Sequence, residues 1–342
     1  DFIRTTADDP NVIAIKQTVY RTGTDSELME ILIDAARKGK EVTVVVELMA
    51  RFDEEANLNW AARLEEVGAH VVYGVVGHKT HAKMSLIVRR EDKTLKRYAH
   101  LSTGNYHPGL FSAHEELCAD VAEVFQQLTG LGRAVRLKHV WQSPFTLHRR
   151  IVAAIRNEAK LAAEGKPARI IAKMNALLEP QIIEELYAAS GAGVKIELIV
   201  RGVCALRPGI EGLSENIRVR SVVGRFLEHS RVFYFENGGA EDVYLASADW
   251  MARNFFRRIE LCFPVLDPGL KRRVIREGLH PYLEDNSQAW VMHAEGNYER
   301  LRARRGTKGR SAQEELLAML PTGSGETRPV TPPVLVKPAQ PA

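Results

Sequence analysis

Val75-Val-Gly-His-Lys-Thr-His-Ala-Lys83 and Val222-Val-Gly-Arg-Phe-Leu-Glu-His-Ser-Arg231 repeat one order of residues in the two halves of the chain. Each begins with two valines and a glycine, and each ends with a histidine, a small residue and a cation. Downstream, Ser102-Thr-Gly-Asn105 is matched by Ser247-Ala-Asp249. Self-similarity at a spacing of about 150 residues is too long for a solenoid and indicates two copies of one domain. We therefore expect a site between the copies.

The segments around these motifs match as well. The apolar runs Val42-Thr-Val-Val-Val-Glu-Leu48 and Val194-Lys-Ile-Glu-Leu-Ile-Val200 each lead to an arginine, Arg51 or Arg201. In both halves such runs alternate with amphipathic helices, as expected of parallel strands with helices packed on them. Two further strands around Glu91-Asp-Lys-Thr94 should form a hairpin added to the first sheet. The sequence thus predicts an α/β fold of two duplicated domains, each a mixed sheet flanked by helices.

The pattern also predicts where the elements lie. In the first half we expect a helix capped by Thr24 or Asp25, a second helix from Asp53 to Gly68, and strands at 12–20, 42–48, 81–90 and 96–102. A helical passage from about Gln126 to Glu164 should connect the halves. The second half should continue with a strand at 169–174, a helix at 179–191, and a last amphipathic helix from Pro268 to about Asn286.

Composition and length fit two ordinary domains. The chain has 342 residues, of which 45% are apolar and 26% charged, so it can bury two cores of typical size. We expect a first domain at residues 1–143, a second at 144–300, and a tail at 301–342. That tail is basic and then rich in proline, with too little apolar content to offset its ordering entropy, so we expect it to be disordered.

The remaining compositional features indicate a cytoplasmic location. Cys118, Cys204 and Cys262 have neither metal-ligand nor redox spacing, so we interpret them as reduced thiols. No stretch is apolar for the length that a membrane span needs. The first residues, Asp1-Phe-Ile-Arg4, lack the pattern of a signal peptide.

The histidines indicate phosphate chemistry. A histidine that attacks phosphorus needs one neutral ring nitrogen free and the other held by an acceptor. If His81 and Lys83 share a strand, their side chains point to the same face, and the same holds for His229 and Arg231. Lys83 and Arg231 could then neutralise phosphoryl oxygens during transfer. Asn105 could donate to a phosphate oxygen or orient a ring.

Other interpretations of the same residues remain open. Basic residues near the first motif form either a solvated surface or a track for a polyanion: Lys79, Lys83, Arg89, Arg90, Lys93, Lys96 and Arg97. The turn at 21–25 either holds phosphate at a helix N-terminus or only caps the helix. A metal site formed by His78 and His81 with His107 or His114 is disfavoured, because residues three apart on an extended segment face opposite ways.

Several longer motifs resemble the polyphosphate kinase family. They are Tyr20-Arg-Thr-Gly-Thr-Asp-Ser26, Glu47-Leu-Met-Ala-Arg-Phe-Asp-Glu-Glu-Ala-Asn57, His81-Ala-Lys83, Thr103-Gly-Asn-Tyr106, Ile199-Val-Arg-Gly202, Leu227-Glu-His-Ser-Arg231 and Ser247-Ala-Asp-Trp-Met251. The resemblance covers roughly residues 1–300. It implies that the two duplicated domains are similar in fold to phospholipase D.

The resemblance also implies roles for individual residues. His81 would be the phosphohistidine intermediate, and His229 with Arg201 would lie against the bound nucleotide. Arg21 and Arg51 fall at positions that the family associates with Mg²⁺. Because a guanidinium has no lone pair to offer a cation, we expect these two side chains to hold phosphate oxygens that share the magnesium.

The implied reaction transfers the terminal phosphoryl group of ATP through His81 to polyphosphate, reversibly, with the polymer in a basic tunnel. ATP, ADP and inorganic polyphosphate are then the partners, Mg²⁺ is the cofactor, and nucleic acid is not a ligand. The resemblance further implies a homo-oligomer when full length and a cytoplasmic enzyme without a transmembrane segment. It leaves peripheral membrane association open.

The chain departs from the family pattern in two ways. After Tyr106 the segment that usually carries a nucleotide-contacting tyrosine is shortened to His107-Pro-Gly-Leu-Phe-Ser-Ala-His114, and the chain looks like a C-terminal half only. These departures favour one alternative, a catalytically impaired fragment that binds polyanions. A second alternative is a phosphodiesterase of the phospholipase D type. It is disfavoured because Val88 stands where the first acid would be and Arg231 replaces the second lysine.

Overall fold

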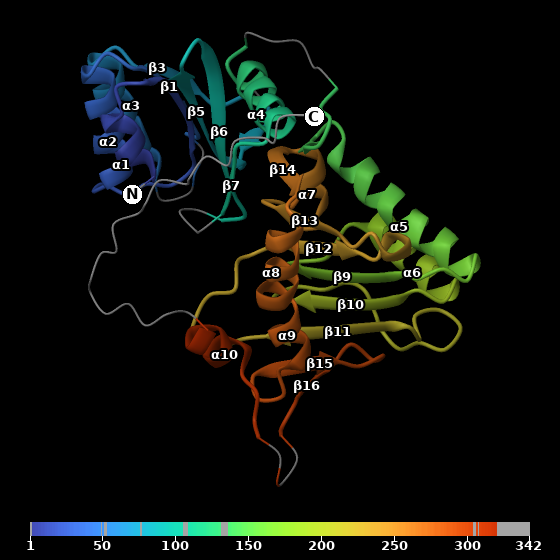
Figure 1. The fold of residues 1–342 in the computed structure, drawn as a ribbon. Helices are drawn as coiled ribbons and strands as arrows, with labels where there is room; N and C mark the ends of the chain where they lie inside the picture. The colour runs from blue at the N-terminus through green and yellow to red at the C-terminus, as the bar shows by residue number, and fades with distance from the viewer. Residues whose placement is uncertain are drawn as a thin grey trace.

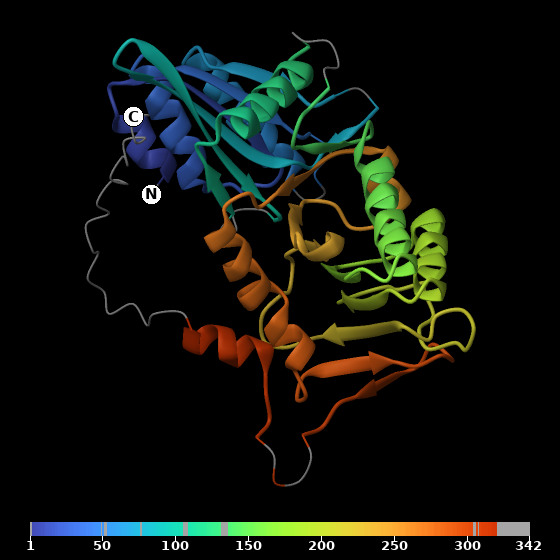
Figure 2. The ribbon, with the colours of Figure 1, turned by 45° about the vertical axis from the view of Figure 1, so that its right-hand side comes forward.

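The computed structural model describes residues 2–48, 50, 53–75, 77–104, 109–130, 136–303, 306 and 308–319, which form two sheets with helices packed on them (Figure 1). Figures 1 and 2 both show the first half, in blue and teal, beside a second half in green to red. None of the helices in these ranges has the length and apolar character that crossing a bilayer requires.

The first sheet has six strands in the order β3-β2-β1-β5-β6-β7. Its strands are β1 (Val12–Val19), β2 (Glu41–Val46), β3 (His70–Tyr73), β5 (Lys83–Glu91), β6 (Thr94–Ser102) and β7 (Leu110–Ser112). The helices of this half are α1 (Phe2–Asp8), α2 (Glu27–Arg37), α3 (Glu54–Glu66) and α4 (Glu115–Leu128). Strand β1 pairs in parallel with β2 and antiparallel with β5, which confirms the expected mixed sheet and its hairpin.

The second sheet has the order β16-β15-β11-β10-β9-β12-β13-β14-β4, and β8 pairs with β14. Its strands are β4 (Lys79–Thr80), β8 (Trp141–Ser143), β9 (Arg169–Met174), β10 (Lys195–Val200), β11 (Ile217–Val222), β12 (Val232–Phe235), β13 (Asp242–Ala246), β14 (Arg258–Pro264), β15 (Ala289–Met292) and β16 (Tyr298–Arg300). The helices are α5 (Leu147–Ala163), α6 (Pro180–Gly191), the 3₁₀ turn Asn237–Gly239, α7 (Ala252–Phe256), α8 (Pro268–Gly278), α9 (His280–Glu284) and α10 (Ala312–Met319).

The two sheets repeat one topology. In the first, β1 lies between a parallel β2 and an antiparallel β5, and β6 and β7 follow outward. In the second, β9 lies between a parallel β10 and an antiparallel β12, and β13 and β14 follow outward. Strands β5 and β12 each begin just after a histidine motif. The duplication read from the sequence is therefore a duplication of the fold.

Helix α2 shows how the sequence produces these elements. Glu27 and Glu30 lie in its first turn and Arg37 in its last, so the charges complement the helix dipole. Just beyond its end, Gly39 adopts a φ of +81°, a left-handed conformation that favours glycine. One face is apolar and buried in the core of the first half: Met29, Leu32, Ile33 and Ala35.

The halves are joined through backbone pairing and a shared core. Strand β4 belongs to the first half of the chain but pairs in parallel with β14 of the second. The backbone N–H groups of His81 and Ala82 then both donate to the carbonyl oxygen of Ile259, at 2.9 and 2.8 Å. Around this junction, buried side chains of α4 pack with those of β14: Leu117, Val121 and Phe125 with Ile259, Leu261 and Phe263. This packing places the first histidine motif against the second half.

The structure corrects several expected elements. The helical passage from Gln126 to Glu164 is instead two helices, α4 and α5, with β8 between them. Helix α2 is capped by Ser26 rather than by Thr24 or Asp25. The helix from Pro268 divides at Leu279 into α8 and α9. Because β8 pairs with β14, residues 141–143 lie in the second sheet, and we propose moving the domain boundary to before Trp141.

The expected disordered tail also needs correction in part. Residues Ala312–Met319 form α10, and Ala312 and Gln313 are buried. Figures 1 and 2 both show α10 against α9. This short helix is stabilised by two glutamates in its first turn and by the buried Gln313. The overall composition of the tail did not indicate these contributions. The expectation for residues 320–342 lies outside the described residues.

Candidate active site

His81 is fixed at the junction of the two halves. Its side chain is 7% exposed, and its Nδ1 lies 2.9 Å from Oε2 of Glu260 on β14. The Tyr20 ring packs edge-on against the imidazole, with centroids 4.8 Å apart. His81 and Ala82 lie between β4 and β5 rather than within a strand, which corrects the expected strand start. The bonds to Ile259 draw these two residues toward β14 and away from the pairing of β5.

Glu260 is a fully buried carboxylate with several donors around it. Oε2 accepts from Ser247 Oγ at 2.5 Å as well as from His81, and Oε1 accepts from Asn254 Nδ2 at 2.7 Å. Burial by itself raises the pKa of Glu260, but His81, Lys83 and the Ser247 hydroxyl outweigh it and hold the pKa below its usual range. Glu260 is therefore ionised, and its Oε2 accepts a hydrogen bond from the protonated Nδ1 of His81.

The His81 ring itself is neutral near pH 7. Burial lowers its pKa to about 4, against the opposing attraction of Glu260 and with the help of Lys83 and Arg258. A neutral imidazole with its proton on Nδ1 has a lone pair on Nε2. The geometry thus meets the requirement stated from the sequence, one nitrogen held by an acceptor and the other nucleophilic.

Lys83 lies directly beside this ring. Its Nζ donates to the His81 carbonyl oxygen and sits 4.9 Å from the centroid of the Tyr20 ring. Burial lowers the pKa of Lys83 well below its usual range, with Glu260 opposing the shift and Arg231 and Arg258 adding to it. An arriving anion would offset these repulsions and favour the charged ammonium. Lys83 also lines a small hollow of about 120 Å³.

Arg231 is a buried tie between the two motifs. Its Nε and Nη2 donate to Asp249 at 3.1 and 3.0 Å, and Asp249 also accepts from the Asn175 backbone at 2.8 Å. Its Nη1 donates to the carbonyl oxygens of Thr103, at 2.7 Å, and His229, at 2.9 Å. A guanidinium has five N–H bonds, so these contacts leave one. Arg231 can act on a phosphate mainly through its charge.

His229 and Arg201 lie together on the second-half side. His229 is half-buried just before β12, which corrects its expected place on a strand. Burial lowers its pKa to about 3, and the nearby charges of Arg231, Lys83 and Arg201 contribute to that shift. Arg201 donates from Nε and Nη2 to Asn175 Oδ1, at 3.1 and 2.8 Å. The structure therefore brings His229 within electrostatic reach of both Lys83 and Arg201.

The expected magnesium residues are only partly described. Arg21 follows β1, with its Nε 3.5 Å from Asp53 and its guanidinium 5.4 Å from the centroid of the Tyr20 ring. Arg51 lies outside the described residues, as does Asn105. Across the described ranges, no three histidine, cysteine or acidic side chains come together to hold a metal ion.

The basic run near the first motif divides in two. Lys79 and Lys83 lie at the site, whereas 89–97 lies at the far end of the β5–β6 hairpin, roughly 20 Å from Lys83 at about 3.3 Å per residue. There Arg89 pairs with Asp9 and Glu91. A hollow of about 640 Å³ at the junction instead gathers basic side chains from both halves: His78, Lys79, Arg253, Arg257 and Arg258.

Sequence reasoning missed Glu260, Asn175 and Arg258. Glu260 stands in the run Arg258-Ile-Glu-Leu-Cys-Phe263, where one carboxylate interrupts an otherwise apolar strand. Such a residue must find a partner when buried, and this was the available signal. The partner itself comes from the other half of the chain. The three cysteines are free thiols, as expected.

Comparison with known families identifies the chain. The model for polyphosphate kinase C-terminal domain 1 matches residues 1–134, and the model for C-terminal domain 2 matches residues 140–313. The chain belongs to the polyphosphate kinase family. It is 64% identical over 324 residues to the polyphosphate kinase of Paraburkholderia phytofirmans, covering 91% of this chain and 47% of that protein. The Burkholderia lata polyphosphate kinase is 63% identical over 331 residues, with 93% and 48% covered.

Solved structures agree with this assignment to the polyphosphate kinase family. The polyphosphate kinase of Porphyromonas gingivalis superposes with a TM-score of 0.85 at 36% identity, covering 93% of this chain and 50% of that one. Phosphatidylserine synthase of Haemophilus influenzae shares the fold alone, with a TM-score of 0.52 at 10% identity over 93% of this chain and 90% of that one. The duplicated α/β fold is confirmed. The chain spans about half the length of the curated relatives it matches.

Proposed function

We propose that this chain carries the phosphotransferase site of a polyphosphate kinase. The site would move the terminal phosphoryl group of ATP to His81 and then to the end of a polyphosphate chain, reversibly. The observation that supports this best is the 2.9 Å contact between His81 Nδ1 and the buried Glu260 carboxylate. It leaves Nε2 as the nucleophilic nitrogen at a junction rich in cations.

In the first step, the Nε2 lone pair of His81 attacks the terminal phosphorus of ATP. The N–P bond forms as the bond from that phosphorus to the bridging oxygen breaks, and the electron pair leaves with ADP. The modified ring is a cation, and Glu260 stabilises it through Nδ1–H. In the second step, a terminal oxygen of polyphosphate attacks the same phosphorus and the electron pair returns to Nε2.

Cations around His81 would stabilise the transferred group. Negative charge moves onto the phosphoryl and leaving oxygens, so fixed positive charge is the main catalytic need. Lys83 is the nearest ammonium, and the buried Arg231 adds charge through the Asp249-oriented guanidinium. His229 is neutral and would donate or accept a hydrogen bond at the nucleotide, beside Arg201.

The hollow at the junction, where four cationic side chains outnumber the single carboxylate of Glu47, would take the polymer. The hollow has a volume of about 640 Å³ and is lined by Lys79, two residues before His81. From the second half it is lined by Arg253, Arg257 and Arg258. Arginine and lysine pair well with phosphate oxygens. Magnesium would be held by ATP oxygens, with Arg21 and Arg51 on those oxygens rather than on the cation.

Labelling tests the proposal. The chain and its His81→Ala variant are incubated with magnesium and either γ-labelled ATP or labelled polyphosphate. The protein is then assayed for acid-labile, base-stable label. Label on the parent alone is the expected result. No label on the parent from either donor would overturn the proposal and favour the alternative, a catalytically impaired fragment that binds polyanions.

Further family properties stay predictions for the whole protein. They are homo-oligomerisation when full length, a cytoplasmic location and no binding of nucleic acid. Peripheral association with membranes is left open. Size-exclusion chromatography of the full-length relative, with and without its N-terminal half, would measure the first.

A further inference from the structure

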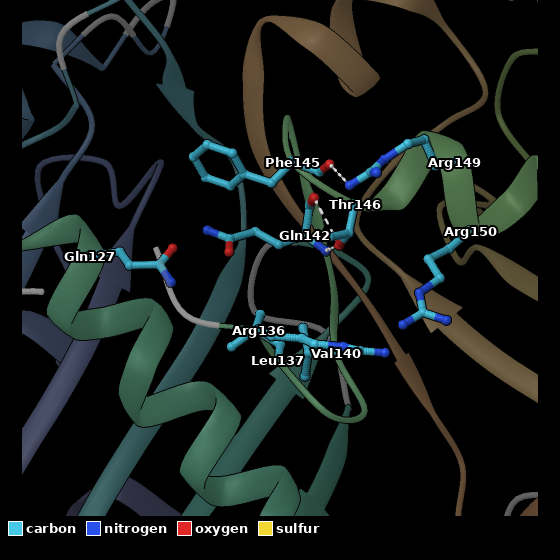
Figure 3. Close-up of a pocket in the computed structure, with 9 residues that line it drawn as sticks. All are labelled: Gln127, Arg136, Leu137, Val140, Gln142, Phe145, Thr146, Arg149 and Arg150. Carbon is cyan, nitrogen blue, oxygen red and sulfur yellow. Dashed lines mark hydrogen bonds between the residues drawn. The ribbon is translucent and has the colours of Figure 1, made fainter. Parts of the chain in front are cut away.

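A second hollow of about 540 Å³ lies between the end of α4 and the start of α5 (Figure 3). Figure 3 shows side chains from both helices and from the segment between them around this space. The lining consists of three arginines, two glutamines and four other residues: Gln127, Arg136, Leu137, Val140, Gln142, Phe145, Thr146, Arg149 and Arg150. No acidic side chain is among them.

The three arginines around this hollow have no acidic partner among the residues that the structure describes. Arg136, Arg149 and Arg150 are exposed, and none makes an ion pair with a carboxylate in the part of the chain that the structure describes. Arg149 donates only to the Phe145 carbonyl oxygen, at 3.1 Å. Three like charges around one space repel each other unless an anion lies between them. Figure 3 shows Arg149 and Arg150 on α5 and Arg136 on the segment that precedes β8.

The start of α5 adds to this positive potential. The helix runs for 17 residues from Leu147, its first turn has no acidic residue, and its N-cap Thr146 makes no side-chain cap bond. Arg149 and Arg150 thus lie near the helix end whose unpaired N–H groups already carry positive charge, an arrangement that disfavours cations. A bound anion would offset the arginine charges and the helix dipole together.

Polar groups on the opposite wall suit a hydrogen-bonding ligand. The Oε1 of Gln127 is buried and makes no hydrogen bond with the described residues, and a buried amide oxygen of this kind calls for a donor or for rotation of the amide. Gln142 is also buried, and Phe145 is half exposed beside it. The hollow therefore offers cations and amide groups at its wall.

This hollow is separate from the His81 site. Residues paired across a ladder point to the same face, and successive residues point to opposite faces. Glu260 is paired with Ser143, and Leu261 with Gln142. The side chain of Gln142, which lines the hollow, therefore lies on the face of β14 opposite to the Glu260 carboxylate that holds His81. Strand β14 itself therefore separates the two, and Leu261 lies on the side of the hollow, in one core cluster with Leu137 and Val140.

We propose that this hollow is a second anion site, which binds a phosphate chain between Arg136, Arg149 and Arg150. The ligand is either a stretch of polyphosphate or the triphosphate of a nucleotide, because both present closely spaced phosphate oxygens to guanidinium groups. Binding here requires no transfer at His81.

Calorimetric titration with tripolyphosphate, and separately with ATP, tests the proposal. The parent is compared at low salt with the Arg136→Gln/Arg150→Gln double variant. The control is Arg272→Gln/Arg302→Gln, which removes the same charge from exposed arginines that have no acidic partner among the described residues. Matching thermal unfolding of the three proteins shows that all are folded.

We expect the pocket variant to lose one class of sites, with at least tenfold weaker binding, while the control titrates like the parent. Loss for tripolyphosphate alone identifies the polymer, and loss for ATP alone identifies a nucleotide. A pocket variant that titrates like the parent, or a control that loses binding equally, would overturn the proposal. Labelling of His81 in the same variants separates this outcome from failure of the proposed phosphotransfer.

Discussion

His81 of the first half and Glu260 of the second half are joined by a 2.9 Å contact between Nδ1 and Oε2, across 179 residues of sequence. The carboxylate is fully buried and also accepts hydrogen bonds from Ser247 and Asn254, both of the second half. The orientation and tautomer of the histidine therefore depend on the docking of the two halves. A chain cut between them should lose the nucleophile's geometry even if each half folds.

Glu260→Gln should reduce phosphorylation of His81 by about a hundredfold or more, the scale seen when a partner that fixes a histidine is made neutral. The NH2 group of the new amide would also replace one of the two carboxylate oxygens, so a donor would face the donor of Asn254 or of His81. The rate of label incorporation from γ-labelled ATP measures the effect. The matched control is Glu299→Gln, which neutralises the exposed partner of His293 and should label at the parental rate. Equal rates in both variants would show that Glu260 does not position His81.

Asp249→Ala should destabilise the second half strongly. The change leaves Arg231, which is 2% exposed, without its bidentate partner, and breaking such a buried pair costs about 3–5 kcal/mol. Urea unfolding measures the loss. Glu277→Ala removes a partly exposed partner of the exposed Arg273 and should change the free energy of unfolding by less than about 0.5 kcal/mol. A small loss for Asp249→Ala would mean that the Arg231 tie contributes little.

The free energy of unfolding should decrease as the pH is lowered from about 6.5 to 4. Burial lowers the pKa of His81 to about 4 and that of His229 to about 3, so the unfolded chain binds protons at these positions that the folded chain does not. Their contribution is therefore present above the unfolded pKa and is lost as pH falls through this window. Glu260 and Asp249, whose pKa values are also lowered, act only at still lower pH.

Denaturant unfolding at several pH values checks this dependence. His81→Gln should flatten the slope between pH 6.5 and 4, while His293→Gln, at an exposed position, should leave it as in the parent. The idea fails if the parent is equally stable across this window.

Gln313→Ala should loosen the segment that carries His229. Gln313 donates to Glu228 Oε1 and accepts from the Phe226 backbone N–H, at 2.8 and 3.0 Å. Glu228 in turn pairs with the buried Lys173 at 2.8 Å. We expect faster amide exchange at residues 224–230 and several-fold weaker ATP binding. Gln126→Ala, at an exposed position on α4, is the control, and unchanged exchange in Gln313→Ala would refute the anchor.

The sequence was sufficient for what depends on local pattern and on repetition. The strands at β1, β2, β9 and β10 and the helices between them follow from apolar periodicity, and the repeated histidine motifs revealed the duplication. The pairing of β4 and β8 with β14 could not be foreseen in this way. Strands β4 and β8 have only two and three residues, which is too short to show a periodic pattern, and their partner β14 lies far along the chain.

The sequence motifs predicted which residues form the site, but not which hydrogen bonds and ion pairs join them. The repeated motifs do meet: Lys83, beside His81, lies within electrostatic reach of Arg231 and His229, and Arg201 lies near His229. Glu260 was missed because the sequence shows a buried acid but not which group it meets. Arg231 was expected to face phosphate, but three of its hydrogen bonds are made to Asp249 and His229 of its own half, and the fourth, to Thr103, depends on how the halves dock. Helix α10 was missed because its stabilising contacts are non-local: Ala312 bonds to Asp285 and Gln313 bonds to Glu228, 27 and 85 positions earlier.

Phosphorus NMR of the base-denatured, labelled protein tests the central claim most directly, because it distinguishes the two ring nitrogens of phosphohistidine. The chain is labelled with ATP or polyphosphate in the presence of magnesium and compared with His81→Ala. We expect one phosphohistidine signal, from phosphate on Nε2, which is absent from the variant. Phosphate on Nδ1, or a signal that persists in His81→Ala, would contradict the assignment of Glu260 as the partner that holds Nδ1 and leaves Nε2 to attack.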